Sequence, residues 1–382
     1  MSYDFDTPVD RRGTDSEKWG RYAGRDILPL WVADTDFLSP PEVIAALTAR
    51  AQHGVFGYGR PTASMVETVL ATCADQWRWE IEPDWLVWLP GLVCGINVTC
   101  RAVGQPGDGV VSFTPVYPPF LQAPGLMERE LVTVPLSGDN ETGWAVDGRR
   151  LEAGLKANGR LLLWCHPHNP VGRSWRREEL ELVAETCLRH RTVICSDEIH
   201  SQLILAEGVS HVPLATLGPE VAARTVTLLA PSKVFNVAGL GCSLAVIPDE
   251  GLRRRFKRAK AGIVPGVNVM GLAAAEAAWK DGGAWLAAQN AYLRANRDYL
   301  AGRIAALAGV TMAPVEATYL AWLDVRSLDL PEPVAYFERH GLGFSDGRAF
   351  AGPGYVRLNF GCPRAVLAEA CDRLDRAVAA AG

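Results

Sequence analysis

The sequence predicts an α/β fold that combines a large, mostly parallel sheet with a smaller α+β unit. From about Pro41 the chain alternates short apolar runs with amphipathic helical stretches, which is the pattern of a parallel sheet with crossover helices. This rhythm then gives way to a long Ala-rich helical region over 268–307, which is followed by shorter strands. We therefore expect a large α/β domain over 41–280, a small α+β domain over 281–382, and an N-terminal segment, 1–40, that packs on the small domain.

Each expected element follows from its periodicity. Apolar runs of four or five residues suit strands buried on both faces, and they occur at Val110–Phe113, Leu161–Cys165, Val193–Ser196, Val226–Ala230 and Leu244–Ile247. Residues 178–190 have apolar side chains near one face and form an expected crossover helix. Further along, helical structure is expected over 268–307 and from about Arg364, with strands at 319–325 and 355–358.

The composition excludes several classes of protein. Among 382 residues, 38 Lys and Arg against 43 Asp and Glu give a net charge of −5, too small to indicate a nucleic-acid or membrane-surface partner. With 48% hydrophobic and 21% charged residues the chain can bury a sizeable core, which disfavours disorder. The longest uncharged stretch, around Trp85–Cys100, contains two glycines and a proline and is too short for a membrane span.

The N-terminus and the cysteines both favour the cytoplasm. The polar start, which carries acidic residues from the fourth position, lacks the basic and apolar regions of a signal peptide. Nine cysteines form an odd set without a C-x-x-C pair, so neither a disulfide framework nor a zinc site is expected.

Polar residues follow three of the expected strands directly. In parallel α/β sheets ligands bind outside the carboxyl ends of the strands, so these positions are candidate site residues. They are His166, His168 and Asn169 after the second run, Asp197, Glu198 and His200 after the third, and Ser232 and Lys233 after the fourth.

Lys233 and Asp197 point to one kind of cofactor chemistry. A partly desolvated lysine loses its proton more easily, as a lysine that bonds covalently to an aldehyde must. An aspartate nearby could keep a pyridine nitrogen protonated, and the two groups together would serve pyridoxal phosphate, which acts as an electron sink. Taken singly, a lone lysine is more often a solvated surface group, and a strand-end aspartate is more often a cap.

The order of motifs resembles the aminotransferase class I/II family, fold type I of the pyridoxal-phosphate enzymes. In detail it is most similar to the cystathionine β-lyases and other carbon–sulfur lyases of the MalY/PatB type. The motifs span nearly the whole chain: DRRGTDSEKW (10–19), LPLWVADTDF (28–37), HGVFGYGRP (53–61), PGLVCGI (90–96), FTPVYPPF (113–120), HPHNPVGR (166–173), SDEIHSQL (196–203), PSKVFN (231–236), TYLAWLDV (318–325) and YVRLNFGCPR (355–364). The resemblance implies a seven-stranded, mostly parallel sheet in the large domain.

The resemblance also implies how the cofactor is held. Lys233 would bond to its aldehyde and shuttle the substrate α-proton, and Asp197 would pair with the ring nitrogen. Asn169 would donate to the ring hydroxyl oxygen, Tyr117 would stack on the ring, and His200 would tune the ring oxygen. The phosphate would lie on the amides of Leu92 and Val93 at a helix N-terminus, beside the Ser232 hydroxyl.

Substrate binding and assembly are implied in the same way. Arg357 would hold the substrate α-carboxylate in a two-pronged ion pair, and the loop with Ala33 and Asp34 would close nearby. Tyr58 would reach the phosphate from a partner subunit, so a homodimer is expected. From the residues alone, Tyr117 could be a packed loop aromatic, Arg357 a structural ion pair, Tyr58 a turn residue and His200 a core histidine.

Three positions depart from the family pattern. His166 stands where Asn is usual, Gln202 where many of these β-lyases have Asp, and Val171 where Thr is common. These departures affect the expected substrate rather than the cofactor contacts, and they make cystathionine itself less secure as the substrate.

The expected reaction is β-elimination from cystathionine or another cysteine S-conjugate, which gives a thiol, pyruvate and ammonia. An aminotransferase or a decarboxylating deaminase built from the same residues is the alternative. Pathways to sulfur-containing antibiotics, including lincosamides, use both kinds of chemistry on this scaffold and are one expected context. A cofactor-less regulator is disfavoured because Lys233 and Asp197 are both present.

Overall fold

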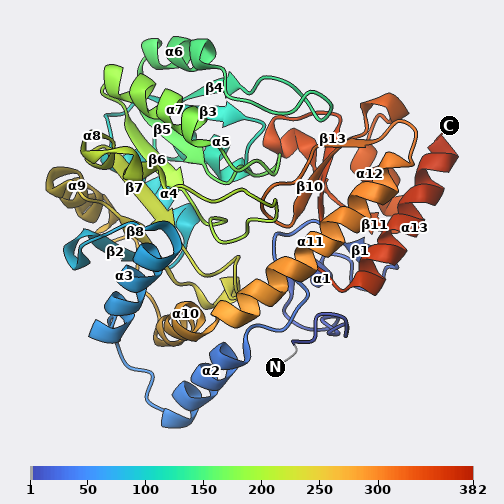
Figure 1. The fold of residues 1–382 in the computed structure, drawn as a ribbon, viewed down its shortest axis with the longest axis horizontal. Helices are drawn as coiled ribbons and strands as arrows, with labels where there is room; N and C mark the ends of the chain where they lie inside the picture. The colour runs from blue at the N-terminus through green and yellow to red at the C-terminus, as the bar shows by residue number, and fades with distance from the viewer. Residues whose placement is uncertain (1–2, 382) are drawn as a thin grey trace.

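The computed structural model describes residues 3–381 and is built around one seven-stranded sheet (Figure 1). Its strand order is β2-β8-β7-β6-β5-β3-β4. The strands are β2 (Leu86–Leu89), β3 (Gly109–Thr114), β4 (Glu130–Pro135), β5 (Gly159–Cys165), β6 (Val193–Asp197), β7 (Thr225–Leu229) and β8 (Ser243–Val246). All neighbouring pairs are parallel except those that β8 makes with β2 and β7. The mostly parallel sheet and its five predicted strands are confirmed; the strands at the two edges of the sheet, β2 and β4, were not predicted.

Helices cover both faces of this sheet because its strands are apolar on both sides. Leu161 and Leu163 of β5 pack in one cluster with α4, α5 and α9, whereas Leu162 and Trp164 pack on the other face with α6 and α7. The helices of this part are α3 (Ala63–Trp77), α4 (Leu92–Ala102), α5 (Pro118–Leu126), α6 (Gly148–Lys156), α7 (Arg177–Arg189), α8 (Pro219–Ala222), α9 (Glu250–Lys260) and α10 (Val269–Asp281).

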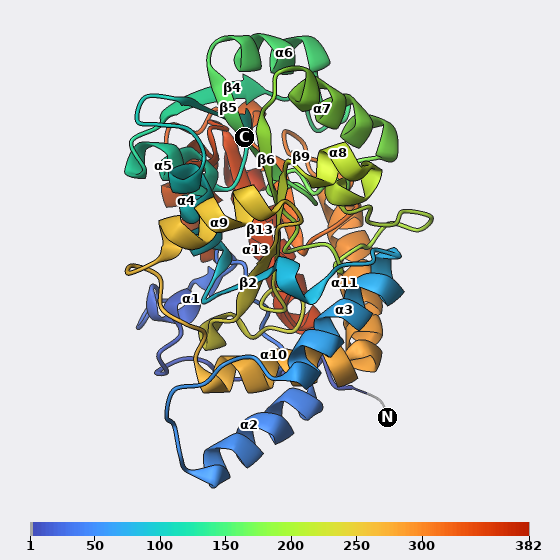
Figure 2. The same ribbon diagram turned by 90° about the vertical axis from the view of Figure 1, so that its left-hand side faces the viewer.

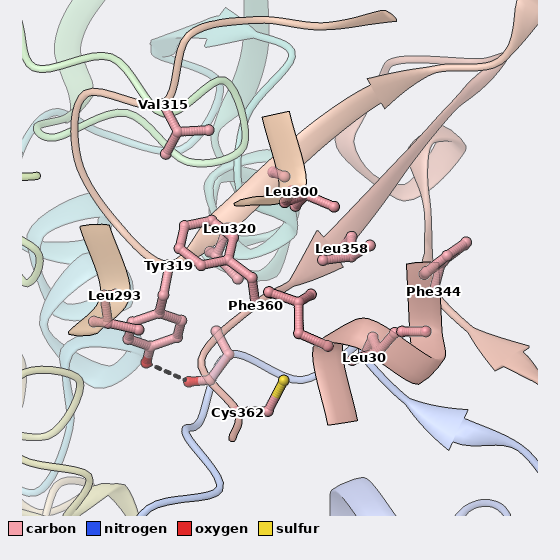
Figure 3. Packing of buried hydrophobic residues seen from close by; sticks show 14 of the residues in the cluster. Leu30, Leu293, Leu300, Val315, Tyr319, Leu320, Phe344, Leu358, Phe360 and Cys362 are labelled. Carbon is pink, nitrogen blue, oxygen red and sulfur yellow. Dashed lines mark hydrogen bonds between the residues drawn. The ribbon is translucent and has the colours of Figure 1, made fainter. Parts of the chain in front are cut away.

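A second, smaller sheet lies in the C-terminal part of the chain. It is antiparallel, with the order β12-β13-β10-β9. Its strands are β9 (Thr311–Met312), β10 (Leu320–Asp324), β12 (Ser345–Asp346) and β13 (Tyr355–Asn359), and the helices beside it are α11 (Gly283–Ala305), α12 (Pro333–Arg339) and α13 (Arg364–Ala381). Figure 3 shows the core between them, where Leu293 and Leu300 of α11 meet Tyr319, Leu320 and Leu358.

The N-terminal segment joins this C-terminal part. After α1 (Glu17–Gly20), β1 (Leu28–Pro29) pairs in parallel with β11 (Leu342–Gly343). Asn359 then donates to the carbonyl oxygens of Val32 and Asp34 at 2.5 and 2.6 Å. The following helix, α2 (Pro41–His53), lies at the periphery against α10 (Figure 2). The exact domain boundaries stay a prediction.

The helical region expected over 268–307 is helical in the structure and consists of two elements. They are the helices α10 and α11, with Gly282 between them. A Cβ on Gly282 would lie 2.4 Å from the Ala278 carbonyl oxygen and 2.8 Å from the Phe235 ring, so only glycine fits this close approach. None of the helices in residues 3–381 is long and apolar enough to cross a membrane.

Candidate active site

Three parallel strands end side by side and place their polar residues around one cavity. The register pairs Cys165 with Asp197 and Asp197 with Leu228, so the carboxyl ends of β5, β6 and β7 are level. A cavity of about 260 Å³ opens there. Its lining includes Ala33, Gly91, Leu92, Val93, Cys94, Tyr117, Cys165, Asn169, Asp197, Ile199, His200, Ser232, Lys233 and Cys242. Most of the predicted site residues therefore meet in one place.

Lys233 stands on the turn that follows β7. Its Nζ donates a hydrogen bond to the Ala33 carbonyl oxygen at 2.7 Å. Burial lowers the pKa of Lys233 below its ordinary value, and the negative charge of Asp34 partly opposes this shift. A lysine whose neutral form is easier to reach is suited to act as a nucleophile and a base.

Asp197 ends β6 and is almost completely buried. Burial raises its pKa to about 7, although the Ile199 amide donates to its Oδ1 at 3.2 Å. Within residues 3–381 its carboxylate forms no ion pair. The attraction of a cationic group in the cavity would offset the cost of burying the Asp197 carboxylate. A protonated ring nitrogen beside Asp197 would be such a group.

Arg357 of β13 is not among the residues that line the cavity but contacts Asn169, which is, and it also has no acidic partner among the residues described. Its Nη1 donates to Asn169 Oδ1 at 3.0 Å and its Nη2 to the Trp31 carbonyl oxygen at 2.8 Å, while its Nε is buried without a partner. Burial lowers the pKa of Arg357 to about 10, so the side chain remains charged at neutral pH. An arginine without an acidic partner can bind the carboxylate group of a ligand.

The N-terminus of α4 supplies an anion site at the cavity wall. Gly91 precedes the helix and makes no side-chain capping bond, and Leu92 and Val93, the first two residues of the helix, line the cavity. Ser232 lines the same cavity. Helix N-termini bind phosphate through such amides and through the helix dipole.

Tyr117 and His200 complete the side-chain wall. The Tyr117 amide donates to the Asn169 carbonyl oxygen at 3.0 Å, which joins these two lining residues. His200 is buried, and its Nδ1 has no hydrogen-bond partner among residues 3–381. Burial, together with the charges of Lys233 and Arg357, lowers the pKa of His200 to about 3, so the ring is neutral. A neutral imidazole in the cavity wall can form a hydrogen bond with a group bound there.

Ala33 and Asp34, which are adjacent in the N-terminal loop, make different contacts. Ala33 lines the cavity, whereas the Asp34 carboxylate pairs with Arg11 at 2.7 Å and lies 3.5 Å from Lys18 Nζ. Lys18 is fully buried and also pairs with Asp36 at 2.7 Å. These ion pairs fix the position of the loop that carries Ala33.

Tyr58 does not reach the cavity of its own chain. It lies in the segment between α2 and α3, and its side chain is fully exposed; Val55 and Phe56 close to it are exposed in part, at 63% and 59%. This placement leaves the expected contact from a partner subunit as a prediction.

The three departures from the family pattern do not line the cavity. His166 is buried beside β6, where its ring stacks on that of His211 at 4.3 Å. Val171 belongs to the core cluster on the α6 and α7 face. Gln202 lines a separate groove with Phe235 and Asn290. These residues can therefore influence the substrate only indirectly.

Several residues at the site were missed. Cys94, Cys165 and Cys242 line the cavity but look like ordinary core cysteines in the sequence. Tyr319 donates to the Ala33 carbonyl oxygen, and the Trp31 carbonyl oxygen accepts from Arg357. Only their place inside the motifs at 28–37 and 318–325 marked them, because a main-chain acceptor leaves no side-chain signature in a sequence.

Comparison with known proteins agrees with this geometry. The family described as aminotransferase class I and II matches residues 25–374. Cystathionine β-lyase PatB of Bacillus subtilis (strain 168) is 35% identical over 98% of this chain and 99% of its own. The crystal structure of OvoB has a TM-score of 0.96 and 48% identity, and covers 98% of this chain and 99% of that one.

This chain is also similar to a solved structure that contains a bound cofactor. Cystalysin of Treponema denticola, whose crystal structure contains pyridoxal 5'-phosphate, has a TM-score of 0.96 and 31% identity, with complete coverage of both chains. The buried Asp197, the free helix terminus at Gly91 and the lysine on the cavity wall are the features that such a cofactor requires. The chain therefore belongs to the aminotransferase class I and II family, has its fold type I architecture, and uses pyridoxal 5'-phosphate.

Proposed function

We propose that this protein is a carbon–sulfur β-lyase that cleaves cystathionine or another cysteine S-conjugate to a thiol, pyruvate and ammonia. The observation that carries the proposal is that Lys233, with its lowered pKa, lines the same cavity as Asn169, which binds Arg357, an arginine with no acidic partner in the described chain. The similarity to cystathionine β-lyase PatB over nearly the whole chain supports it.

The cofactor would be held by groups on every wall of the cavity. Lys233 would bond to the aldehyde, Asp197 would face the ring nitrogen, and Asn169 and His200 would hydrogen-bond the ring oxygen. Tyr117 would stack on the ring. The phosphate would be bound by Ser232 and the amides of Leu92 and Val93, with Tyr58 of the other subunit of a homodimer. When bound, the cofactor supplies an electron sink for the substrate α-carbon.

Arg357 would orient the substrate. Its guanidinium is charged and held by Asn169 and the Trp31 carbonyl, so it can bind the α-carboxylate with little reorganisation. The main chain at Ala33 and Asp34 would close over the substrate amino-acid group. Both contacts place the α-carbon within reach of Lys233.

Lys233 would then move the proton. Once the substrate amino group has replaced it at the aldehyde, the neutral Lys233 amine would take the proton from the α-carbon, and the C–S bond would break with its electron pair on sulfur, which leaves as the thiolate. The Ala33 carbonyl oxygen holds the amine but cannot accept its proton, so the base remains available. The remaining three-carbon fragment hydrolyses to pyruvate and ammonia.

A product assay tests this proposal. The purified holoenzyme is incubated with an S-alkyl cysteine without a keto-acid acceptor, and thiol and pyruvate are measured. We expect the two products in equal amounts, and we expect Lys233→Ala to abolish both while Lys280→Ala, an exposed lysine on α10, leaves the rate unchanged. A keto acid that retains sulfur, formed only when an acceptor is added, would contradict the lyase and establish an aminotransferase.

A further inference from the structure

Three segments that are far apart in the sequence meet at one main-chain oxygen. The Ala33 carbonyl oxygen accepts a hydrogen bond from Lys233 Nζ at 2.7 Å and a second one from the Tyr319 hydroxyl at 3.1 Å. Figure 3 shows the Tyr319 bond as a dashed line to the N-terminal segment. Tyr319 is fully buried and precedes β10, and it is not part of the cavity wall.

We propose that Tyr319 is a positioning residue for Lys233, which acts by fixing the carbonyl group that holds the lysine amine. This inference rests on the role given to Lys233 in the proposed function. It adds a residue that touches neither cofactor nor substrate.

The neighbouring carbonyl groups show why Tyr319 matters. The Trp31 carbonyl oxygen accepts from Arg357, and those of Val32 and Asp34 accept from Asn359. Each carbonyl group from 31 to 34 is therefore fixed by a side chain of the small sheet or, at Ala33, by Tyr319 and Lys233. When Lys233 bonds to the cofactor and its amine leaves this position, Tyr319 remains to hold the acceptor in place for its return.

A direct chemical role for Tyr319 does not fit its surroundings. Burial raises the pKa of Tyr319 far above its ordinary value, so the hydroxyl keeps its proton and cannot act as a base. That proton is already donated to Ala33. The ring lies in the same buried cluster as Leu293 and Phe360 and is edge-on to His200.

The test uses Tyr319→Phe, which removes only the hydroxyl group. It measures how fast the cofactor-free protein captures pyridoxal phosphate. Capture is followed by visible absorbance, then fixed with borohydride and located by peptide mapping. Because a loosely held amine spends less time in the reactive position, we expect capture at Lys233 to slow about fivefold, the value of one lost hydrogen bond. With an S-alkyl cysteine, kcat should fall while KM is unchanged, since Arg357 is untouched.

Two further variants separate positioning from a loss of stability. Tyr22→Phe removes another buried tyrosine hydroxyl, which donates to Glu338 at 2.9 Å far from Lys233, and it should capture the cofactor at the wild-type rate. Replacement of Tyr319 by 4-aminophenylalanine restores a donor at the same place and should restore the rate. A Tyr319→Phe rate within twofold of wild type, or no rescue by the amino group, would overturn the inference.

The capture assay uses no substrate, so its outcome does not depend on the reaction that the enzyme catalyses. If the borohydride-fixed cofactor maps to a lysine other than Lys233, the proposed site is wrong. If it maps to Lys233 in every variant at equal rates, only the role of Tyr319 is wrong.

Discussion

Burial destabilises the charged forms of Asp197 and Lys233. The resulting shifts in their pKa values suit the two groups to chemistry. Asp197 is buried and Lys233 partly buried beside the cavity, and this burial raises the pKa of Asp197 to about 7 and lowers that of Lys233. The sequence marked both residues because each follows an apolar strand. Their shifted pKa values could not be read from the sequence, since desolvation depends on the elements that cover them.

A pH-dependent difference in stability should follow from Asp197. A carboxyl group whose pKa is higher in the folded chain stabilises that chain fully below its unfolded pKa near 4, and this contribution is lost as the pH rises through 7. In cofactor-free protein, wild type should therefore lose about 1–3 kcal/mol relative to Asp197→Asn between pH 5 and pH 8. Urea unfolding at both pH values measures this.

The control for that experiment is Asp84→Asn, which changes an exposed aspartate. Its stability should run parallel to that of wild type at every pH. If Asp197→Asn also runs parallel, Asp197 has an ordinary pKa in the folded chain. In holoenzyme the same Asp197→Asn substitution should weaken cofactor retention, because the ring nitrogen loses its anionic partner.

The helix α4 shows how one element serves both packing and binding. Its first residues face the cavity, and Gly95, one turn later, lies against the sheet. A Cβ at Gly95 would lie 2.9 Å from Leu228 of β7 and 3.1 Å from Leu89 of β2. The predicted motif 90–96 contained this glycine, but only the packed structure shows that it sets the distance between helix and sheet.

Gly95→Ala should therefore destabilise the protein although alanine favours helices. We expect a loss of about 1–3 kcal/mol from overpacking, and weaker cofactor binding because the N-terminus of α4 is displaced. Gly302→Ala is the matched control, since Gly302 is also inside a helix but has open space around its Cβ position, and it should gain up to about 1 kcal/mol. Thermal unfolding and cofactor titration measure both effects; equal stabilities would show that α4 can shift freely.

At the scale of the whole molecule, the site is assembled from both sheets and from the N-terminal segment. The large sheet places Asp197 and Lys233, the small sheet places Arg357, and the segment from 31 to 34 joins them through its carbonyl groups. Tyr58 remains outside, fully exposed on a peripheral segment. The homodimer inferred from the family resemblance would bring it to the cavity of the other subunit.

Mixing two defective variants tests this shared site. A subunit with Lys233→Ala lacks the base of its own site. A subunit with Tyr58→Ala lacks the phosphate contact that it would supply to the site of its partner. If Tyr58 acts across the interface, subunits mixed and allowed to exchange should form hybrids with one intact site and recover about a quarter of wild-type activity. Each variant alone is the control, and a mixture that is no more active than the sum of its parts would place Tyr58 in its own subunit or outside the site.

The sequence by itself determined the alternating strands and helices, the strand-end residues and the cofactor chemistry. It could do so because apolar periodicity and residue type are local properties. Only the tertiary structure decided which side chains share the cavity, that His166 and Gln202 lie outside it, and that Tyr319 and Lys233 meet at the Ala33 carbonyl. Such contacts join residues some hundreds of positions apart through main-chain atoms that every residue has, so no local pattern records them.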